Sequence, residues 1–231
     1  MPIAMRDSDF SLFKTKPGEP MAAKTTAEPF LPARLNLKSL REAAAHCEGC
    51  ELYKKATQTV FGEGPRAASV MLVGEVPGDE EDKQGQPFVG PSGHLLDQAL
   101  EEAGIDRNEV YVTNAVKHFR WEPRGKRRLH KKPTAGQIQA CRPWLQAEIL
   151  VVKPRVVVCL GATAAQSLLG PSFRITKQRG KFLHRDEIGW ITATYHPSAI
   201  LRAPDPEDRA EKREQFVADL HRVARRLDAV A

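Results

Sequence analysis

Long apolar runs are absent from this sequence, and so is the pattern of a secretory leader. No stretch approaches the roughly 18 consecutive apolar residues that a membrane-spanning helix needs. The first residues, MPIAMRDSDF, lack a basic segment followed by an apolar one, so we expect no signal peptide and no membrane association. Cysteine is scarce, with four unevenly spaced residues in 231, which argues against a disulfide framework. We therefore expect a cytoplasmic protein with reduced thiols.

Aromatic residues are also few, at 6%, but the 41% hydrophobic content is ordinary for a globular protein. The length predicts one domain that buries a core without disulfides. Residues 1–34 contain five prolines and no sustained periodicity, so we expect a disordered extension followed by a domain over residues 35–231. The net charge of +6 favours a nucleic-acid partner only if the positive charge is clustered.

Strands and helices alternate along the domain. Short β-branched runs predict strands at residues 69–75, 110–115, 155–161 and 190–195. Apolar spacing and end signals predict helices at residues 36–47, 91–103, 134–152, 162–169 and 207–227, the third of them bent or interrupted at Pro143. This alternation indicates an α/β fold, a three-layer αβα sandwich with a mostly parallel four-stranded central sheet. Ligands of such sheets bind beyond the carboxyl ends of the strands.

Three polar side chains follow these strands directly. Glu75 ends the first strand and is suited to act as a base or to stabilise a cation, although it is equally typical of a helix-capping loop. Asn114 ends the second strand, where its amide can pair with a base edge or simply form a turn. His196 follows the fourth strand and can donate to an oxyanion or be structural. The glycines after the first strand match neither GxGxxG nor a phosphate-binding P-loop.

A basic segment lies between Phe119 and Pro133. Residues 120–132 contain seven Lys or Arg, among them Lys126, Arg127 and Arg128, together with His130 and one Glu. We interpret the segment as a loop beside the ligand crevice. Phosphate contact is the natural function of such a cluster, and the neighbouring Phe119 and Trp121 favour nucleic acid over a merely solvated loop.

Three of the cysteines suggest a metal centre. Cys47 and Cys50 form a Cys-x-x-Cys pair, Cys141 lies alone on a predicted helix, and Cys159 lies in an apolar strand as a core residue. A four-coordinate site needs one more ligand, and His118 is the best candidate because it precedes the Cys141 helix. This donor set suits either zinc or an iron–sulfur cluster. Cysteines that bind no metal are the remaining alternative.

Together these segments resemble the uracil-DNA glycosylase superfamily, nearest to the iron–sulfur family 4 and to the X-type enzymes. The resemblance covers about residues 40–228. It rests on CEGCELY, the GE-x-PG loop, GQPFVGPSGHLLD, YVTNAVKH, the KRRLH loop, VVVCLGATAA and HPSAILR, of which KRRLH is the X-type feature.

The resemblance implies a role for each matching residue. Phe88 would stack on a uracil flipped out of the DNA, Asn114 would read its polar edge, and Gly74 and Val76 would complete the base pocket. Glu75 would assist departure of the base or position a nucleophile, and His196 would stabilise negative charge on the uracil oxygen. The residues expected to face DNA are Lys126, Arg127, Arg128, Ser198 and Arg202. A structural [4Fe–4S] cluster would be held by Cys47, Cys50, His118 and Cys141.

His130 distinguishes two outcomes. In X-type enzymes the loop histidine attacks C1′ after uracil leaves, which gives a covalent protein–DNA adduct, and a tethered neutral imidazole is a competent nucleophile for this step. The X-type loop is usually GEQPG, whereas Val76 occupies the Gln position here and is closer to family 4.

We therefore predict a uracil-DNA glycosylase that is trapped on DNA through His130. The alternatives are a family-4 enzyme that releases a free abasic site and a non-catalytic DNA-binding module with structural zinc. The expected partner is uracil-containing DNA, with single strands accepted, and nothing in the sequence demands more than a monomer.

Overall fold

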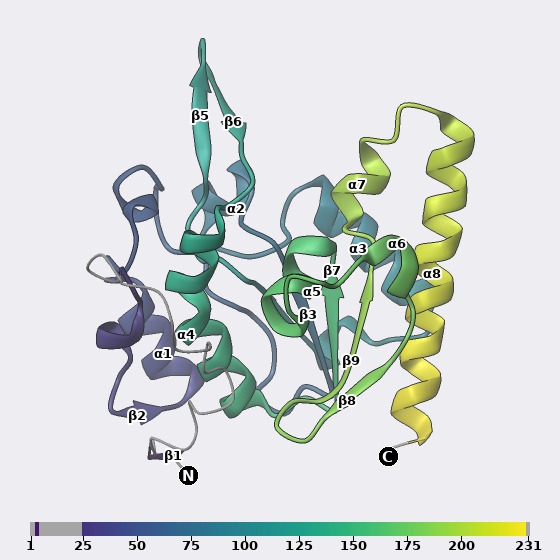
Figure 1. The fold of residues 1–231 in the computed structure, drawn as a ribbon, viewed down its shortest axis with the longest axis horizontal. Coiled ribbons are helices and arrows are strands. Elements are labelled where there is room, and N and C mark those ends of the chain that lie inside the picture. Colours follow the sequence, from purple (N-terminus) through teal and green to yellow (C-terminus); the bar gives the residue numbers. More distant parts are fainter. Residues whose placement is uncertain (1–2, 5–24, 230–231) are drawn as a thin grey trace.

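The computed structural model describes residues 3–4 and 25–229 (Figure 1). Most of the extension predicted over residues 1–34 therefore lies outside the described residues. Residues 25–34 are described and pack on the domain. The side chain of Ala27 is 1% exposed, and its amide donates to the carbonyl of Ala140 at 2.8 Å. The packed chain thus begins before the predicted boundary at residue 35, because Ala27 fills an apolar cluster that also contains Leu35 and Leu40.

A five-stranded sheet forms the centre of the molecule. Its strands in spatial order are β4 (Val110–Asn114), β3 (Val70–Gly74), β7 (Val156–Leu160), β9 (Gly189–Thr194) and β8 (Leu183–Arg185). The first four are parallel, which confirms the predicted strands, whereas β8 is antiparallel to β9. The predicted count of four is therefore too low. All three residues of β8 are exposed, so this edge strand lacks the apolar pattern that marks the other strands.

Helices cover both faces of the sheet. Successive side chains of a strand point to opposite faces, so Val70 and Leu72 belong to one apolar cluster and Met71 and Val73 to another. The first cluster includes residues of α3 (Pro91–Glu102) and α8 (Pro206–Ala229), and the second includes residues of α4 (Ala135–Val152) and α5 (Ala162–Leu169). This arrangement is consistent with the predicted three-layer sandwich.

Helix α4 continues through Pro143, so of the predicted bend or interruption the interruption is wrong. Proline removes one backbone hydrogen bond. The helix nevertheless persists because most of its residues are buried and because Thr134 and Gln137 form a capping box at its start.

The remaining elements are short. They are β1 (Ile3–Ala4), η2 (Glu28–Phe30), β2 (Arg34–Leu35), α1 (Leu37–Ala44), η3 (Glu51–Lys54), α2 (Asp79–Gln84), η4 (Arg107–Glu109), β5 (Trp121–Arg124), β6 (Arg127–His130), α6 (Ile175–Gln178) and α7 (Pro197–Leu201). Within the described residues, no helix combines the length and the apolarity required to cross a bilayer.

The basic segment is a β-hairpin and not the predicted loop. Strands β5 and β6 pair antiparallel, with Trp121 opposite His130 and Arg124 opposite Arg127. Gly125, with φ of 58°, takes the left-handed conformation that the tight turn requires. The hairpin projects from the body of the molecule at the same end as α7 (Figure 1).

Candidate active site

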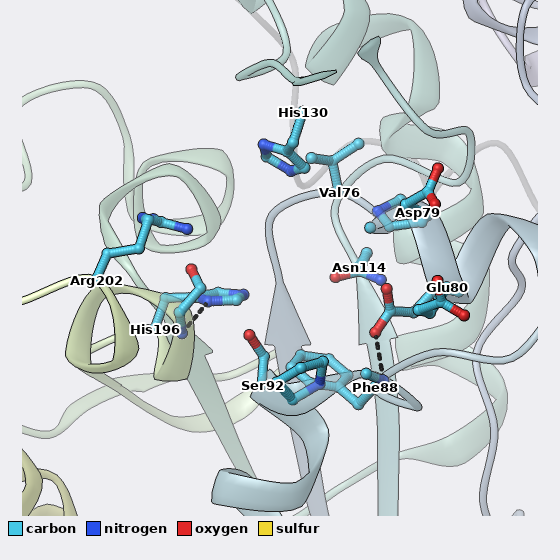
Figure 2. Close-up of a pocket in the computed structure, with 15 residues that line it drawn as sticks. Val76, Asp79, Glu80, Phe88, Ser92, Asn114, His130, His196 and Arg202 are labelled. Atoms are coloured by element: carbon cyan, nitrogen blue, oxygen red, sulfur yellow. Dashed lines mark hydrogen bonds between the residues drawn. The ribbon is translucent and has the colours of Figure 1, made fainter. Parts of the chain in front are cut away.

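A cavity of about 290 Å³ lies at the carboxyl ends of the strands, between α2, the hairpin and α7 (Figure 2). Seven of the predicted site residues line it, namely Val76, Phe88, Asn114, His130, His196, Ser198 and Arg202. They come from segments far apart in the sequence, and the topological rule for parallel sheets therefore located this cavity correctly.

Gly74 is absent from the cavity lining but controls its shape. A Cβ atom at this position would lie 2.2 Å from Oδ1 of Asn114 and 2.8 Å from Cζ of Phe88. Both distances are far below ordinary van der Waals contact, so only glycine lets these two side chains approach the end of β3. Gly74 thus acts as a spacer for these two side chains, and its predicted part in the base pocket stays a prediction.

The backbone of Phe88 has an unusual conformation. Its φ of 58° falls in the left-handed region, which an aromatic residue seldom adopts. Gly93 permits the tight loop, because a Cβ there would lie 1.7 Å from the carbonyl oxygen of Phe88. Backbone strain of this kind persists where the surrounding structure holds it and is concentrated at functional sites. The loop thereby presents the ring of Phe88 to the cavity, 6.0 Å from the imidazole of His196.

The hydrogen bonding of His196 defines its tautomer. Its Nδ1 accepts a hydrogen bond from the amide of Ser198 at 3.1 Å, so the proton of the neutral ring is on Nε2. Burial, together with the nearby Arg202 and His130, lowers the pKa of His196 to about 4. The imidazole is therefore neutral at pH 7 and offers an Nε2–H donor. In Figure 2 its ring points into the cavity.

Glu75 lies at the end of β3 but is not among the lining residues. Its Oε1 accepts a hydrogen bond from the hydroxyl of Thr163, at the start of α5, at 2.5 Å. This bond holds the carboxylate at the strand ends. No local pattern pointed to Thr163 as a partner, because the two residues are 88 positions apart.

His130 faces the cavity from the base of the hairpin, on the side opposite Phe88 and Ser92 (Figure 2). Partial burial lowers the pKa of its imidazole below the usual value, and Glu75 opposes this effect. A neutral ring is therefore favoured at pH 7.

Arg128 attaches the hairpin to α2. Its guanidinium contacts Oδ1 of Asp79 at 2.5 Å and Oδ2 of the buried Asp82 at 2.6 Å, and it lies over the rings of Phe119 and Trp121. These partners give Arg128 a structural role in attaching the hairpin, and its predicted contact with DNA stays a prediction. Lys126 and Arg127 are exposed.

Helix α2, which was not among the predicted helices, contributes to the cavity. Asp79, Glu80 and Glu81 all line the cavity, and Oε1 of Glu81 accepts a hydrogen bond from the amide of Gly90 at 3.0 Å. Four acidic residues in the first turn are a typical helix start, since they complement the positive end of the helix dipole. That pattern could have predicted α2.

Three of the predicted metal ligands belong to one apolar cluster. Cys47 accepts a hydrogen bond from Nε1 of Trp144 at 3.2 Å, and Cys141 accepts one from the amide of Lys117 at 3.2 Å. Cys50 completes the set of thiols, and N–H donors of this kind support sulfur ligands. Cys159 is fully buried in β7, which confirms that it is a core residue.

His118 lines a cavity of about 250 Å³ together with Cys47. The hydroxyl of Thr59 donates to the carbonyl of Ala44 at 2.9 Å, so it must accept at 2.8 Å from Nε2–H of His118. Nδ1 is then the nitrogen left with a lone pair for a metal.

The donor set fits a cluster better than a single ion. Among the described residues, no three Cys, His, Asp or Glu side chains lie close enough together to hold one metal ion. The ligands of a [4Fe–4S] cluster bind separate iron atoms and lie farther apart. The three thiols with their N–H donors are compatible with such a cluster.

Comparison with known proteins identifies the family of the chain. The family model of the uracil DNA glycosylase superfamily matches residues 61–221, and the chain belongs to that superfamily. The type-4 uracil-DNA glycosylase of Sulfurisphaera tokodaii is 37% identical over 178 residues, which cover 74% of this chain and 78% of the relative. The type-4 enzyme of Thermotoga maritima is 37% identical over 193 residues, covering 78% and 94%. The type-5 uracil-DNA glycosylase of Thermus thermophilus is 33% identical over 140 residues, covering 54% and 60%.

Proposed function

We propose that this protein is a DNA-repair glycosylase that excises uracil from DNA and turns over; the relatives that it resembles are named type-4 uracil-DNA glycosylases. The observation that carries the proposal is the meeting of Phe88, Asn114 and His196 in one cavity of about 290 Å³. These three residues supply a stacking surface, a paired donor and acceptor, and a neutral hydrogen-bond donor. A flipped-out base needs all three.

Recognition begins when the uracil leaves the DNA stack and enters this cavity. The ring of Phe88 stacks on the base, and the amide of Asn114 pairs with the polar edge. The position of Asn114 is fixed by its close approach to Gly74. Val76 lines the cavity and adds an apolar contact.

The glycosidic bond then breaks between C1′ and the uracil nitrogen, and the bonding electrons move onto the base. Nε2–H of His196 stabilises the charge that develops on the uracil oxygen, and its low pKa keeps it a neutral donor. The carboxylate of Glu75, held by Thr163, stabilises the cationic sugar and accepts a proton from the water that adds to C1′.

Basic residues on both sides of the cavity suit a DNA strand. Arg202 lines the cavity beside α7, and Lys126 and Arg127 are exposed on the hairpin. These side chains are positioned for phosphate contact, and Ser198 lines the cavity next to them. The protein acts as a monomer and accepts single-stranded substrate in this proposal.

We assign Cys47, Cys50, Cys141 and Nδ1 of His118 as ligands of a structural [4Fe–4S] cluster. When bound, such a cluster would cross-link η3, the segment after β4, and α4. It would thereby order the region from which the hairpin emerges.

A second candidate is favoured by one observation, the position of His130 in the cavity. In this alternative a lone pair on the neutral imidazole forms a bond to C1′ as uracil departs, and the ring then loses its N–H proton. The product is an N-linked protein–DNA adduct, as in the X-type enzymes that the KRRLH segment resembles.

One experiment separates the candidates. The protein is mixed with an end-labelled oligonucleotide that contains one uracil, and half of the sample is denatured in SDS while the other half is treated with alkali. Turnover predicts unshifted DNA that breaks at the uracil position after alkali. Covalent capture predicts a shifted band that His130→Ser abolishes.

The matched control is Arg127→Ser, which removes an exposed hairpin side chain but leaves the cavity intact. It should weaken DNA binding without changing which product forms. Intact DNA under both treatments would refute uracil excision and leave only a DNA-binding role.

A further inference from the structure

A buried ionic network lies directly beneath the base-reading residue. Lys117 and Glu148 form an ion pair at 2.5 Å whose side chains are 1% and 0% exposed. Among the ion pairs of the described chain, this is the one in which both partners are enclosed. Burying two charges costs several kcal/mol per ion, and apolar residues of similar size are often as stable. The pair therefore calls for an explanation other than stability.

The ammonium group of Lys117 uses all three of its donors. They reach Oγ1 of Thr113 at 2.6 Å, Oε2 of Glu148 at 2.5 Å and the carbonyl oxygen of Asn114 at 2.8 Å. The last bond holds the main chain of Asn114 itself.

Glu148 anchors the ammonium group from α4. Its Oε1 accepts hydrogen bonds from the hydroxyl of Tyr111 at 2.9 Å and from the amide of Gly62 at 3.1 Å, and Thr113 donates to both of its oxygens. The carboxylate is thus fixed by three residues besides Lys117, two of them in β4. A side chain fixed in this way is suited to hold another residue in place.

We propose that Lys117 is a positioning residue for uracil recognition, which fixes the backbone of Asn114 through its ammonium group and depends on Glu148 for its own placement. The inference rests on the proposed function of Asn114. The backbone amide of Lys117 also donates a hydrogen bond to Sγ of Cys141, so the Asn114–His118 segment connects the base pocket with the cysteine centre. Lys117 itself does not line the cavity and contacts no substrate.

The test replaces the ion pair by neutral side chains of similar size, Lys117→Met with Glu148→Gln. No charge is left buried alone, and the new glutamine amide oxygen can still accept from Tyr111 and Gly62. We expect kcat/KM for uracil release to fall on the order of tenfold, the effect of losing one charge-assisted hydrogen bond. Inhibition by free uracil should weaken by a similar factor, while the Kd for uracil-free DNA stays unchanged.

Two further variants separate positioning from a general loss of structure. Arg155→Met removes a partly buried basic side chain just before β7, where it bonds Leu227 and Ser69. It should lower the unfolding midpoint without affecting uracil inhibition. Thr113→Val removes one partner of both Lys117 and Glu148 without changing any charge. It should weaken uracil inhibition in the same direction and provides the test if the double variant fails to fold.

The outcomes are distinct. Iron content and visible absorption, measured on every variant, report whether the cysteine centre is still loaded. If the double variant or the Thr113→Val variant keeps wild-type uracil inhibition and kcat/KM, the inference about Lys117 is overturned while the proposed function stands. Wild-type protein that releases no uracil would overturn the proposed function and the inference with it.

Discussion

Replacing Gly74 with alanine should disable base recognition while leaving the fold intact. The added Cβ would lie 2.2 Å from Oδ1 of Asn114, more than 1 Å inside the ordinary contact distance of 3.4–4 Å. It would also lie 2.8 Å from Cζ of Phe88. Relief of these contacts requires the side chain of Asn114, of Phe88 or of both to move by about the overlap.

The magnitude follows from that displacement. A misplacement of about 1 Å in a recognition residue can reduce the reaction rate by about 10²-fold. Overpacking of this kind costs about 1–3 kcal/mol of the free energy of unfolding, which a domain of this size tolerates. We therefore expect a much larger loss of kcat/KM than of stability.

The assay measures uracil release from a single-uracil oligonucleotide in parallel with urea unfolding. Gly104→Ala is the matched control, because a Cβ there meets nothing within 4 Å and only the φ of 72° opposes it. The control should lose about 1 kcal/mol of stability and no activity. If Gly74→Ala protein releases uracil at the wild-type rate, the close approach of Phe88 and Asn114 does not shape the base site.

Three other predictions concern separate parts of the molecule. The pKa of His196 falls from 6.5 to about 4 on folding, so between these pH values the unfolded chain binds more protons than the folded chain. The contribution of His196 to the free energy of unfolding is therefore complete above about pH 6.5 and declines as the pH falls toward 4. Urea unfolding from pH 4 to 8 should therefore be less pH-dependent in His196→Asn than in the wild type, and parallel curves would contradict the assigned burial. Arg128→Met should lower the free energy of unfolding by about 2 kcal/mol, because it leaves the buried Asp82 without its cation. The same variant should make the hairpin more susceptible to cleavage by trypsin, whereas Arg127→Met should change the free energy of unfolding little. Cys141→Ser should remove the bound iron and the visible absorption while Cys159→Ser keeps both, and equal iron contents in the two variants would refute the assigned ligands.

The parallel core of the fold was predictable from sequence because buried strands and amphipathic helices have clear apolar patterns. Strand β8 and the β5–β6 hairpin lack such patterns, since their residues are mostly exposed and polar. Residues at or just beyond the carboxyl end of a strand, such as Asn114 and His196, were correctly expected at the cavity, because the topology alone brings them there.

Other features of the site depend on contacts that no local pattern records. The bond between Thr163 and Glu75 and the attachment of Arg128 to α2 join segments 88 and 49 residues apart. The steric role of Gly74 and the left-handed backbone of Phe88 emerge only when the loops are placed against each other. The residue types in the sequence indicate which side chains are chemically suited to a site. The structure adds which of them, such as Arg128, form contacts with other parts of the protein.

The pairing of the β5–β6 hairpin has a consequence for how the site can evolve. Side chains alternate between the two faces of a strand, so Arg128 and His130 share the face that contacts Phe119, and Leu129 points the other way with 42% of its surface exposed. Inserting a single residue in the short turn at Gly125 and Lys126 would shift β6 by one position, so that Leu129 takes the place of His130. An apolar leucine would then face the cavity in place of the imidazole. A one-codon insertion at two turn residues that do not themselves line the cavity is thus enough to replace the imidazole there with an apolar side chain.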